Sequence, residues 1–352
     1  MPCQRISRAF GYTRAVMNPR RLPAEWAPQS AVMLTWPHAR GDWGETLPAV
    51  EECFIEMADA IACRQRLIVS CYDSTGCEAL RARLRFRGTP LGRVALHAVP
   101  SNDVFARDHG PLTVLDHGHP RLLHFRFDAW GGKYDASLDA QITRRLHEQG
   151  AFGDLPLEPV DFVLEGGSIE SDGAGTLLTT ESCLLRHSRN PGLDKAGIEA
   201  ALRQHLGAER ILWLTQGSIP GDDTDGHVDT LARFADMQTI VYQGGDGSLA
   251  AMREQLAALH TADGQPYRLL ELPAPEPKRS PEGAPLPATY ANFLIINGAV
   301  LAPVYDDPAD AAALQVLRQA FPGRDILPIA ALPLIGQYGS VHCASMQIPA
   351  TP

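Results

Sequence analysis

Apolar residues recur at helical spacing in five segments of the chain. In residues 49–64, for example, Phe54, Met57 and Ile61 fall on one face of a helix. A glycine directly follows two of the other segments, in the position where a helix commonly ends. We therefore predict helices over residues 49–64, 135–149, 194–206, 248–260 and 308–320.

Short apolar runs lie between these segments and predict β-strands. Asn297-Gly298 separates the last two neighbouring runs, and this dipeptide is a strong signal for a hairpin turn. Strand pairs, one helix and a further strand follow one another about five times, as in a repeat architecture. The predicted strands cover residues 67–71, 112–115, 122–127, 175–179, 211–214, 239–242, 293–296, 300–304 and 326–328.

The interleaving of helices and strand pairs favours one domain over a division into two. We expect this domain to span residues 21–352. Residues 1–20 are expected to be a flexible extension, because they carry several arginines but no apolar run of a secretory signal. Four prolines in residues 273–287 predict a loop, which could be a lid over a nearby site or a plain surface loop.

The charge balance narrows the class of partner. The chain has 31 basic and 41 acidic residues and a net charge of −10, which disfavours nucleic acid and suits a small cationic molecule. No run of about 18 apolar residues occurs, so we expect no membrane span. Seven cysteines without a CxxC pair predict free thiols in a reducing cytoplasm, and neither disulfides nor a zinc site.

One acid-rich segment and one distant cysteine carry the candidate chemistry. Residues 221–229 contain four aspartates and His227, and on an extended strand His227 and Asp229 would point to the same side. Cys343 follows two glycines, which allow the backbone to approach a ligand closely. Its neighbour His342 would point the opposite way on an extended segment, so we do not assign it as a base. Acids, a histidine and a thiol suit attack on a cationic carbon, which indicates guanidine chemistry.

Two other interpretations of residues 221–229 are a metal site and a solvated acidic turn. A calcium loop fails because the EF-hand spacing breaks down after Asp223 and Asp225, and a zinc site would need more His or Cys nearby. A solvated acidic turn that caps a strand remains possible, above all for Asp222.

Several further motifs follow in a fixed order: LPAEW (22–26), TWPH (35–38), ND (102–103), RDHGP (107–111), FDAWGGKY (127–134), EGGS (165–168), DDTDGHVD (222–229), YANF (290–293) and HC (342–343). Together they resemble the agmatine deiminases of the bacterial peptidylarginine deiminase type, within the guanidino-group-modifying (pentein) superfamily. The resemblance runs from about residue 21 to residue 349. It implies an α/β fold, a five-bladed propeller of ββαβ-like units around a central active site. It also implies hydrolysis of a guanidine to a ureido group and ammonia, with no metal and no cofactor.

The resemblance implies a role for five side chains. Cys343 would attack the guanidine carbon, His227 would transfer protons, and Glu165 would hold the histidine ring. Asp108 and Asp229 would bind the N–H groups of the planar cation through charge-assisted hydrogen bonds.

Four more residues are expected to contact the substrate. Asp223 would meet the distal ammonium of agmatine and Trp130 would form an apolar or cation–π wall, although each could equally be structural. Asn292 lies in a matching motif. Phe105 stands where the family usually has Trp, and residues 337–340 depart from the usual Gly-Gly-Gly-Asn approach to the cysteine. Both departures change the shape of the pocket and leave the exact guanidine open.

The most specific expectation is therefore deimination of agmatine in the cytoplasm, by a protein that could form a homo-oligomer. The alternatives are a deiminase of peptidyl-arginine or another guanidine, a metal-dependent agmatine ureohydrolase, an amidinotransferase, and a guanidine- or polyamine-binding protein on the same scaffold.

Overall fold

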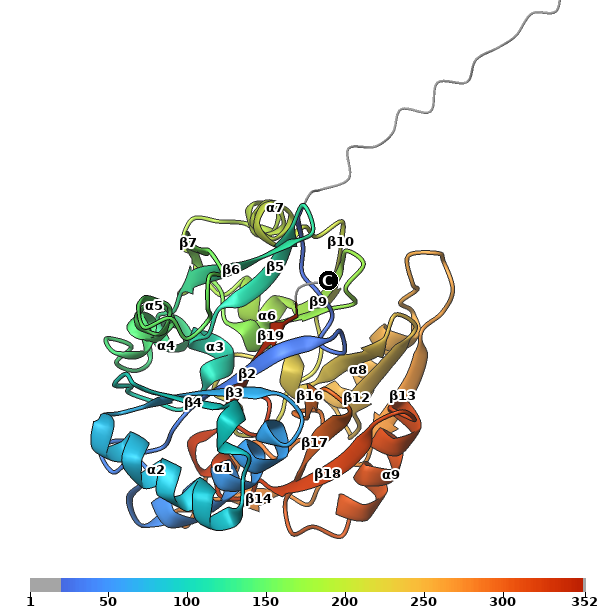
Figure 1. Cartoon of the computed structure of the whole chain (residues 1–352). Helices are drawn as coiled ribbons and strands as arrows, with labels where there is room; N and C mark the ends of the chain where they lie inside the picture. The colour runs from blue at the N-terminus through green and yellow to red at the C-terminus, as the bar shows by residue number, and fades with distance from the viewer. Residues whose placement is uncertain (1–19, 351–352) are drawn as a thin grey trace, which may run out of the picture.

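Five sheets with one common plan make up most of the computed structural model, which describes residues 20–350 (Figure 1). In each sheet two strands pair antiparallel, a helix follows, and the chain returns as a strand parallel to the second one. A parallel neighbour requires such a crossover, and the helix provides it. The prediction of about five ββαβ-like units is confirmed.

Four of the units are continuous in sequence. They are β5 (Leu112–Asp116), β6 (His119–Arg126), α5 (Asp139–Glu148) and β7 (Leu157–Val163); β8 (Ile169–Ser171), β9 (Thr176–Thr180), α7 (Lys195–Leu206) and β10 (Arg210–Leu214); β11 (Ala232–Asp236), β12 (Thr239–Gln243), α8 (Ser248–Ala257) and β13 (Arg268–Leu272); and β16 (Leu294–Ile296), β17 (Ala299–Val304), α9 (Asp310–Ala320) and β18 (Asp325–Ala330).

The fifth unit joins the two ends of the described chain. β19 (Ser345–Pro349) pairs antiparallel with β2 (Gln29–Thr35), with Ser345 opposite Leu34. After helix α1 (Leu47–Ala62), strand β3 (Arg66–Cys71) runs parallel to β2. Helix α2 (Ser74–Arg87) and strand β4 (Val94–Ala98) then extend the same sheet.

Smaller elements fill the connections. Strand β1 (Arg20–Arg21) pairs with the edge of β5, and residues 273–287 contain a short hairpin of β14 (Lys278–Arg279) and β15 (Pro285–Leu286). The remaining short helices are α3 (Ala106–His109), α4 (Ala129–Gly132), α6 (Glu181–Leu184), η1 (Gly44–Thr46), η2 (Leu91–Arg93), η3 (Gly166–Ser168), η4 (Val228–Thr230) and η5 (Leu334–Gln337).

Local signals explain where several elements begin and end. The Asp194 side chain accepts a hydrogen bond from the Gly197 N–H (2.9 Å) at the start of α7, and Gly207 closes the helix with a φ of 72°. Asn297 and Gly298 form the predicted turn between β16 and β17. Helix α2 was not predicted, because only Leu80 and Leu84 among its residues are buried.

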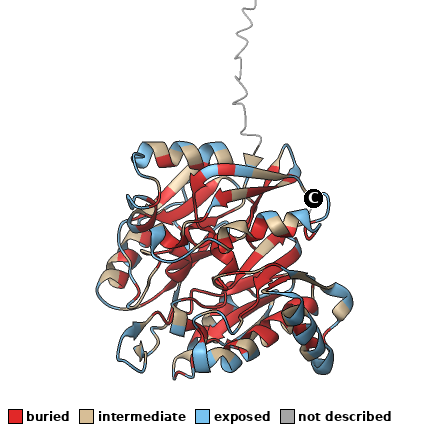
Figure 2. Cartoon of the chain, turned by 90° about the vertical axis from the view of Figure 1, so that its left-hand side faces the viewer, coloured by how far each residue is buried: buried red, intermediate tan, exposed pale blue. Residues whose placement is uncertain are grey.

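The core lies between the sheets and the helices that cover them. Figure 2 shows buried residues concentrated on the strands in the middle of the molecule, while the helices expose their outer faces. Strands β16 and β17 are buried along almost their whole length, which matches their continuous apolar sequence. Within residues 20–350, no helix combines the length and the apolar character that crossing a membrane requires.

Each of the five units contributes one candidate residue from an equivalent place. Asp108, Glu165, Asp229, Asn292 and Cys343 lie two to four residues before the first strands of their units, which are β5, β8, β11, β16 and β19. These segments meet in one region, because Asn292 contacts both Asp229 and Cys343, and His227 lies between Asp108 and Glu165. Convergence of equivalent positions is the arrangement expected when repeated units surround a common centre.

Candidate active site

A cavity of about 500 Å³ opens to the surface beside Cys343. Asp108, Phe105 and Trp130 line its inner part, and Arg40 and Tyr72 line it as well. Its polar wall is mainly acidic, because Asp42, Asp103, Asp135, Asp139 and Asp223 also face it. No residue of 273–287 belongs to the described lining, which favours the surface-loop interpretation of that segment over the lid.

Asn292 fixes the position of Cys343. The Asn292 side-chain oxygen accepts hydrogen bonds from the backbone N–H groups of His342 (3.0 Å) and Cys343 (3.2 Å), and its amide nitrogen lies 3.2 Å from Cys343 Sγ. The Asn292 amide also donates to the backbone oxygen of Asp229 (3.5 Å). Asn292 is fully buried and absent from the lining of the cavity, so it holds the thiol from behind.

Gly339 brings the chain close to the aromatic wall before it reaches Cys343. A Cβ atom at this position would overlap the ring of Phe105, so only glycine fits there. The Phe105 ring in turn packs edge to face against Trp130, with centroids 5.9 Å apart. Phe105 therefore packs between Gly339, on the approach to Cys343, and the Trp130 wall of the cavity.

The Cys343 thiol is buried beside two carboxylates. Its sulfur lies 3.8 Å from Asp229 Oδ2. Burial, and then the negative charges of Asp229 and Asp108, raise the pKa of Cys343 well above its ordinary value. The substrate-free site therefore holds a thiol, and a cation placed between the two carboxylates would favour the thiolate.

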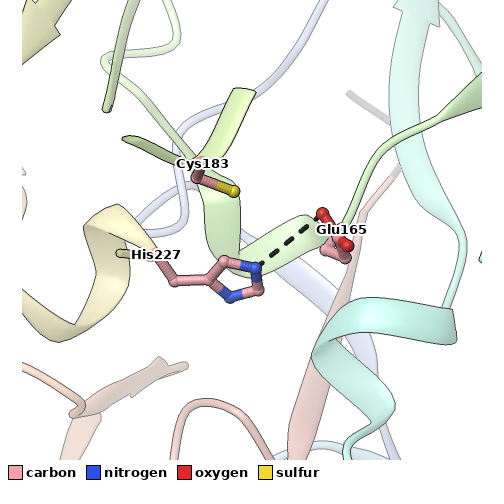
Figure 3. Close-up of side chains that lie close together, drawn as sticks. All are labelled: Glu165, Cys183 and His227. Carbon is pink, nitrogen blue, oxygen red and sulfur yellow. Dashed lines mark ion pairs between the residues drawn. The ribbon is translucent and has the colours of Figure 1, made fainter. Parts of the chain in front are cut away.

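His227 is fully buried and lies between the carboxylates of Asp108 and Glu165. Its Nδ1 is 3.7 Å from Asp108 Oδ1, and its Nε2 is 3.8 Å from Glu165 Oε2. Figure 3 shows one ring nitrogen facing Glu165, with the sulfur of Cys183 close to both side chains. Burial acts to lower the pKa of His227, but Asp108, Cys183 and Glu165 outweigh it and hold the pKa well above its ordinary value. The ring is thus an imidazolium at neutral pH.

The segment that carries His227 is a turn, so the predicted extended strand is wrong here. Thr224 Oγ1 accepts from the His227 N–H (2.9 Å), and the Thr230 hydroxyl donates to the His227 backbone oxygen (2.8 Å). These side-chain bonds replace a strand ladder, and residues Val228–Thr230 form η4. His227 and Asp229 nevertheless share one neighbourhood, because both border the place that a Cβ at Gly167 would occupy.

Arg189 holds Glu165 and was not predicted. Its Nε donates to both Glu165 oxygens (2.8 and 2.9 Å), and its two terminal nitrogens donate to Asp225 Oδ2 and to the backbone oxygen of Thr224 (2.8 Å each). Burial acts to raise the pKa of Glu165, but His227 and Arg189 outweigh it and hold that pKa below its ordinary value. Glu165 is therefore an anion beside the imidazolium.

The acids of residues 221–229 have separate structural tasks. The Asp222 carboxylate accepts from the N–H groups of Thr224 (3.1 Å) and Gly226 (2.7 Å), so for Asp222 the turn interpretation is correct. Asp223 already has partners as well, because it accepts from the Tyr134 hydroxyl (2.6 Å) and lies 3.2 Å from Lys133 Nζ. Asp223 lines the cavity as a neutralised anion rather than a free one.

Asp108 is oriented by two donors. Trp130 Nε1 donates to its Oδ2 (2.9 Å), and the Gly167 N–H donates to its Oδ1 (3.1 Å). Burial raises the pKa of Asp108, while the charge of His227 opposes the shift. Trp130 thus lines the cavity and also positions a carboxylate, and its backbone takes a left-handed φ of 58° to do so.

The other clamp residue, Asp229, is bonded from one side only. His342 Nδ1 donates to its Oδ2 (2.7 Å), whereas its Oδ1 is buried without a partner among the described residues. The His342 side chain leaves the cavity, as expected, yet it contacts the site through Asp229. Neither Arg189 nor this contact could be read from sequence spacing, because both join segments that are far apart.

Two sets of described side chains have the composition of metal ligands. One is Glu165, Cys183 and His227, and the other is Glu25, Glu170 and His342. In each set an arginine already bonds a glutamate: Arg189 bonds both oxygens of Glu165, and Arg233 bonds Glu25 (2.8 Å) and Glu170. The arginines compete with any metal ion for these carboxylates.

Comparison with known proteins identifies the family. The sequence pattern of the Porphyromonas-type peptidyl-arginine deiminases matches residues 21–349. An agmatine deiminase from Stutzerimonas stutzeri is 34% identical over 94% of this chain and 95% of its own.

Solved structures agree with this assignment. A protein from Porphyromonas gingivalis, provisionally named an arginine deiminase, is 47% identical with a TM-score of 0.85 over 94% of this chain and 99% of its own. A C. jejuni agmatine deiminase with substrate bound is 32% identical with a TM-score of 0.86, over 94% and 97% of the two chains. The chain belongs to the Porphyromonas-type peptidyl-arginine deiminase family.

Proposed function

We propose that this protein hydrolyses agmatine to N-carbamoylputrescine and ammonia through a covalent intermediate on Cys343. The observation that carries the proposal is that the thiol of Cys343 and the carboxylate of Asp108 line an acidic cavity, with the imidazolium of His227 and the carboxylate of Asp229 buried directly beside them. Relatives named agmatine deiminases, which match over nearly the whole chain, support the choice of substrate.

The guanidinium binds first. It donates N–H groups to Asp108 and to Asp229 in charge-assisted hydrogen bonds, and Asp229 has an acceptor oxygen that no other group within residues 20–350 uses. Its positive charge offsets the two carboxylates that hold the Cys343 pKa high, so the thiol loses its proton to solvent. The thiolate then faces a flat cation whose plane the two acids fix.

Attack by sulfur gives a neutral tetrahedral adduct. The His227 imidazolium protonates one –NH₂ group, which leaves as ammonia, and a cationic amidino-cysteine remains. Neutral His227 next takes a proton from water, and the hydroxide adds to the same carbon. Collapse of this second adduct breaks the C–S bond, the hydroxyl proton returns to sulfur, and the ureido product is released. Glu165, fixed by Arg189, keeps the ring oriented and favours its protonated form.

The distal ammonium needs an acid without a cation of its own. Asp223 was the predicted partner, but Lys133 already neutralises it. Asp103 also lines the cavity, and no ion pair involves it among residues 20–350. Burial, opposed by the Val104 N–H and aided by Asp42 and Asp108, raises the Asp103 pKa to about 7. An arriving ammonium would relieve this shift, so we assign the distal contact to Asp103.

One observation favours a second candidate substrate. Arg40 lines the cavity and lies over the Tyr72 ring, with its guanidinium carbon 4.8 Å from the centroid. A guanidinium at this place could pair with a carboxylate, as the C-terminal arginine of a peptide would supply. Family membership does not favour the ureohydrolase, amidinotransferase or binding-protein alternatives.

The organisation of the chain follows from the same site. We propose that residues 21–352 form one catalytic domain, since all five units supply a residue to it. The predicted extension 1–20 lies almost entirely outside the described residues. The six described cysteines are free thiols, which supports a cytoplasmic location. Homo-oligomer formation stays a prediction.

The decisive experiment is a substrate panel. Agmatine, free arginine, a peptide with C-terminal arginine and shorter guanidines are scored for ureido product and ammonia. We expect agmatine to react fastest, with Cys343→Ser inactive and the exposed Cys63→Ser unchanged as its matched control. Intact mass spectrometry after rapid quenching would detect the amidino adduct. Preference for the peptide would reject agmatine, and full activity of Cys343→Ser would reject the covalent route.

A further inference from the structure

A buried row of charged side chains stands behind Asp229. His342 bridges two carboxylates, with Nδ1 2.7 Å from Asp229 Oδ2 and Nε2 2.7 Å from Glu25 Oε2. A ring nitrogen can bond to a carboxylate only if it carries a hydrogen. With both acids ionised, the ring must therefore hold two protons and a positive charge.

Both acids are held in the ionised form. Glu25 accepts from an Arg233 terminal nitrogen (2.8 Å) and from the Ile295 N–H (2.7 Å), and Arg107 lies 3.7 Å away. Burial acts to raise the pKa values of Glu25 and Asp229. It is outweighed at Glu25 by His342, Arg233 and Arg107, and at Asp229 by His342, His227 and Arg233, so both pKa values are lowered. The charged and titratable groups around the row are Glu25, Glu170, Arg107, Arg233, Asp108, His227 and Cys343.

We propose that His342 is a positioning residue, a fixed imidazolium that holds Asp229 through its Oδ2 and keeps this carboxylate ionised and oriented for the guanidinium. The proposal rests on the function assigned above. It also gives a task to the motif at residues 22–26, because Glu25 holds the far side of the ring. The chain of contacts runs from Glu25 through His342 to the carboxylate that binds substrate.

Substitution of His342 can test the positioning of Asp229 without disturbing the position of Cys343. Asn292 bonds the backbone N–H groups of residues 342 and 343, and these bonds do not depend on the side chain at 342. A neutral replacement would leave Cys343 in place and remove the cation from Asp229. The pKa of Asp229 would then rise, because burial would be opposed only by the smaller effects of His227 and Arg233.

The test compares His342→Gln with His124→Gln, a matched control in which a partly buried histidine bonds only the Ala140 oxygen (3.1 Å) away from the cavity. For His342→Gln we expect KM for agmatine to rise at least about 10-fold. The acid limb of the kcat/KM profile should move up by about one pH unit. The control should keep the wild-type profile.

Loss of stability is separated from loss of charge by a second variant. His342→Gln leaves Glu25 buried without one of its cations, so Tm should fall. The double variant Glu25→Gln/His342→Gln also removes the negative charge of Glu25, so its Tm should recover in part. The acid limb of its kcat/KM profile should stay displaced, because Asp229 still lacks the cation. If folded His342→Gln kept the wild-type KM and the wild-type acid limb of the kcat/KM profile, the proposal would be overturned, since only a structural role would then remain.

A measurement without turnover separates this proposal from the proposed function. Nitrogen-15 NMR of histidine-labelled, substrate-free protein should show both His342 nitrogens protonated, as the two 2.7 Å contacts require, with the resonance assigned by the signal that His342→Gln lacks. A neutral ring would overturn the proposal even if agmatine is the substrate. A charged ring would support it even if the substrate panel selects another guanidine or if folded His342→Gln is too slow for kinetics.

Discussion

Gly167 makes room for the catalytic side chains, so adding one methyl group there should disable the enzyme. An ideal Cβ at Gly167 would lie 2.6 Å from His227 Nδ1, 3.0 Å from Asp229 Oδ2 and 3.1 Å from Asp108 Oδ1. Ordinary contact begins at 3.4 Å, so His227 would have to move by 0.8 Å (3.4 minus 2.6). A displacement of about 1 Å in an active site can cost about 10²-fold in rate, and overpacking costs about 1–3 kcal/mol of stability.

The backbone would not resist this substitution. The φ of Gly167 lies outside the left-handed region, and its N–H would still donate to Asp108 in the alanine variant. We therefore expect Gly167→Ala to fold, with kcat/KM for agmatine reduced about 100-fold. Gly92→Ala is the matched control, because a Cβ there meets nothing within 4 Å. If Gly167→Ala turned over agmatine at the wild-type rate, His227, Asp229 and Asp108 would not need the close arrangement described here.

Three other predictions follow from single contacts. Trp130→Phe keeps the apolar wall but loses a hydrogen bond to a carboxylate, worth about 1.5–3 kcal/mol, so steady-state kinetics should show kcat/KM lower by about 10- to 100-fold. Arg189→Gln removes the cation that bonds both oxygens of buried Glu165 and leaves this carboxylate with His227 at 3.8 Å, so urea denaturation near neutral pH should show a loss of about 3–5 kcal/mol. The folded-state pKa of Glu165 lies below its unfolded value, so the stability it confers is present above about pH 4.3 and lost as the pH falls; the difference between wild type and variant should shrink in acid. Iodoacetamide at pH 8 should modify the exposed Cys63 faster than Cys343 in substrate-free protein, as peptide mass spectrometry would measure, and the reverse order would contradict the raised thiol pKa.

Local signals in the sequence were sufficient for much of the fold. Capping residues and helical periodicity located α1, α7 and α9 to within a few residues, and Asn297-Gly298 located a hairpin. Helix α2 was not predicted, because its exposed face is rich in arginine and its buried face is narrow. Its caps, Asp73 and Gly88, were visible signals that apolar periodicity alone does not weigh.

The site was predictable in its members but not in its contacts. The order of motifs selected Cys343, whereas nothing in the spacing indicates that Arg189 bonds Glu165. The same is true of His342 and Glu25, which are 317 positions apart and 2.7 Å from each other. Such pairs form because burial leaves a charge no partner except another buried group, and that requirement is met in three dimensions rather than along the chain.

The pairing of β19 with β2 has a consequence for the newly made protein. The strand that follows the nucleophile seals a sheet whose other members come from the first hundred residues, so β2 keeps an open edge until synthesis has passed Pro349. An open edge invites association with other chains. A polypeptide interrupted before Ser345 should thus be both inactive and prone to aggregate. The chain can become active only at the stage of synthesis at which β19 covers the edge of β2.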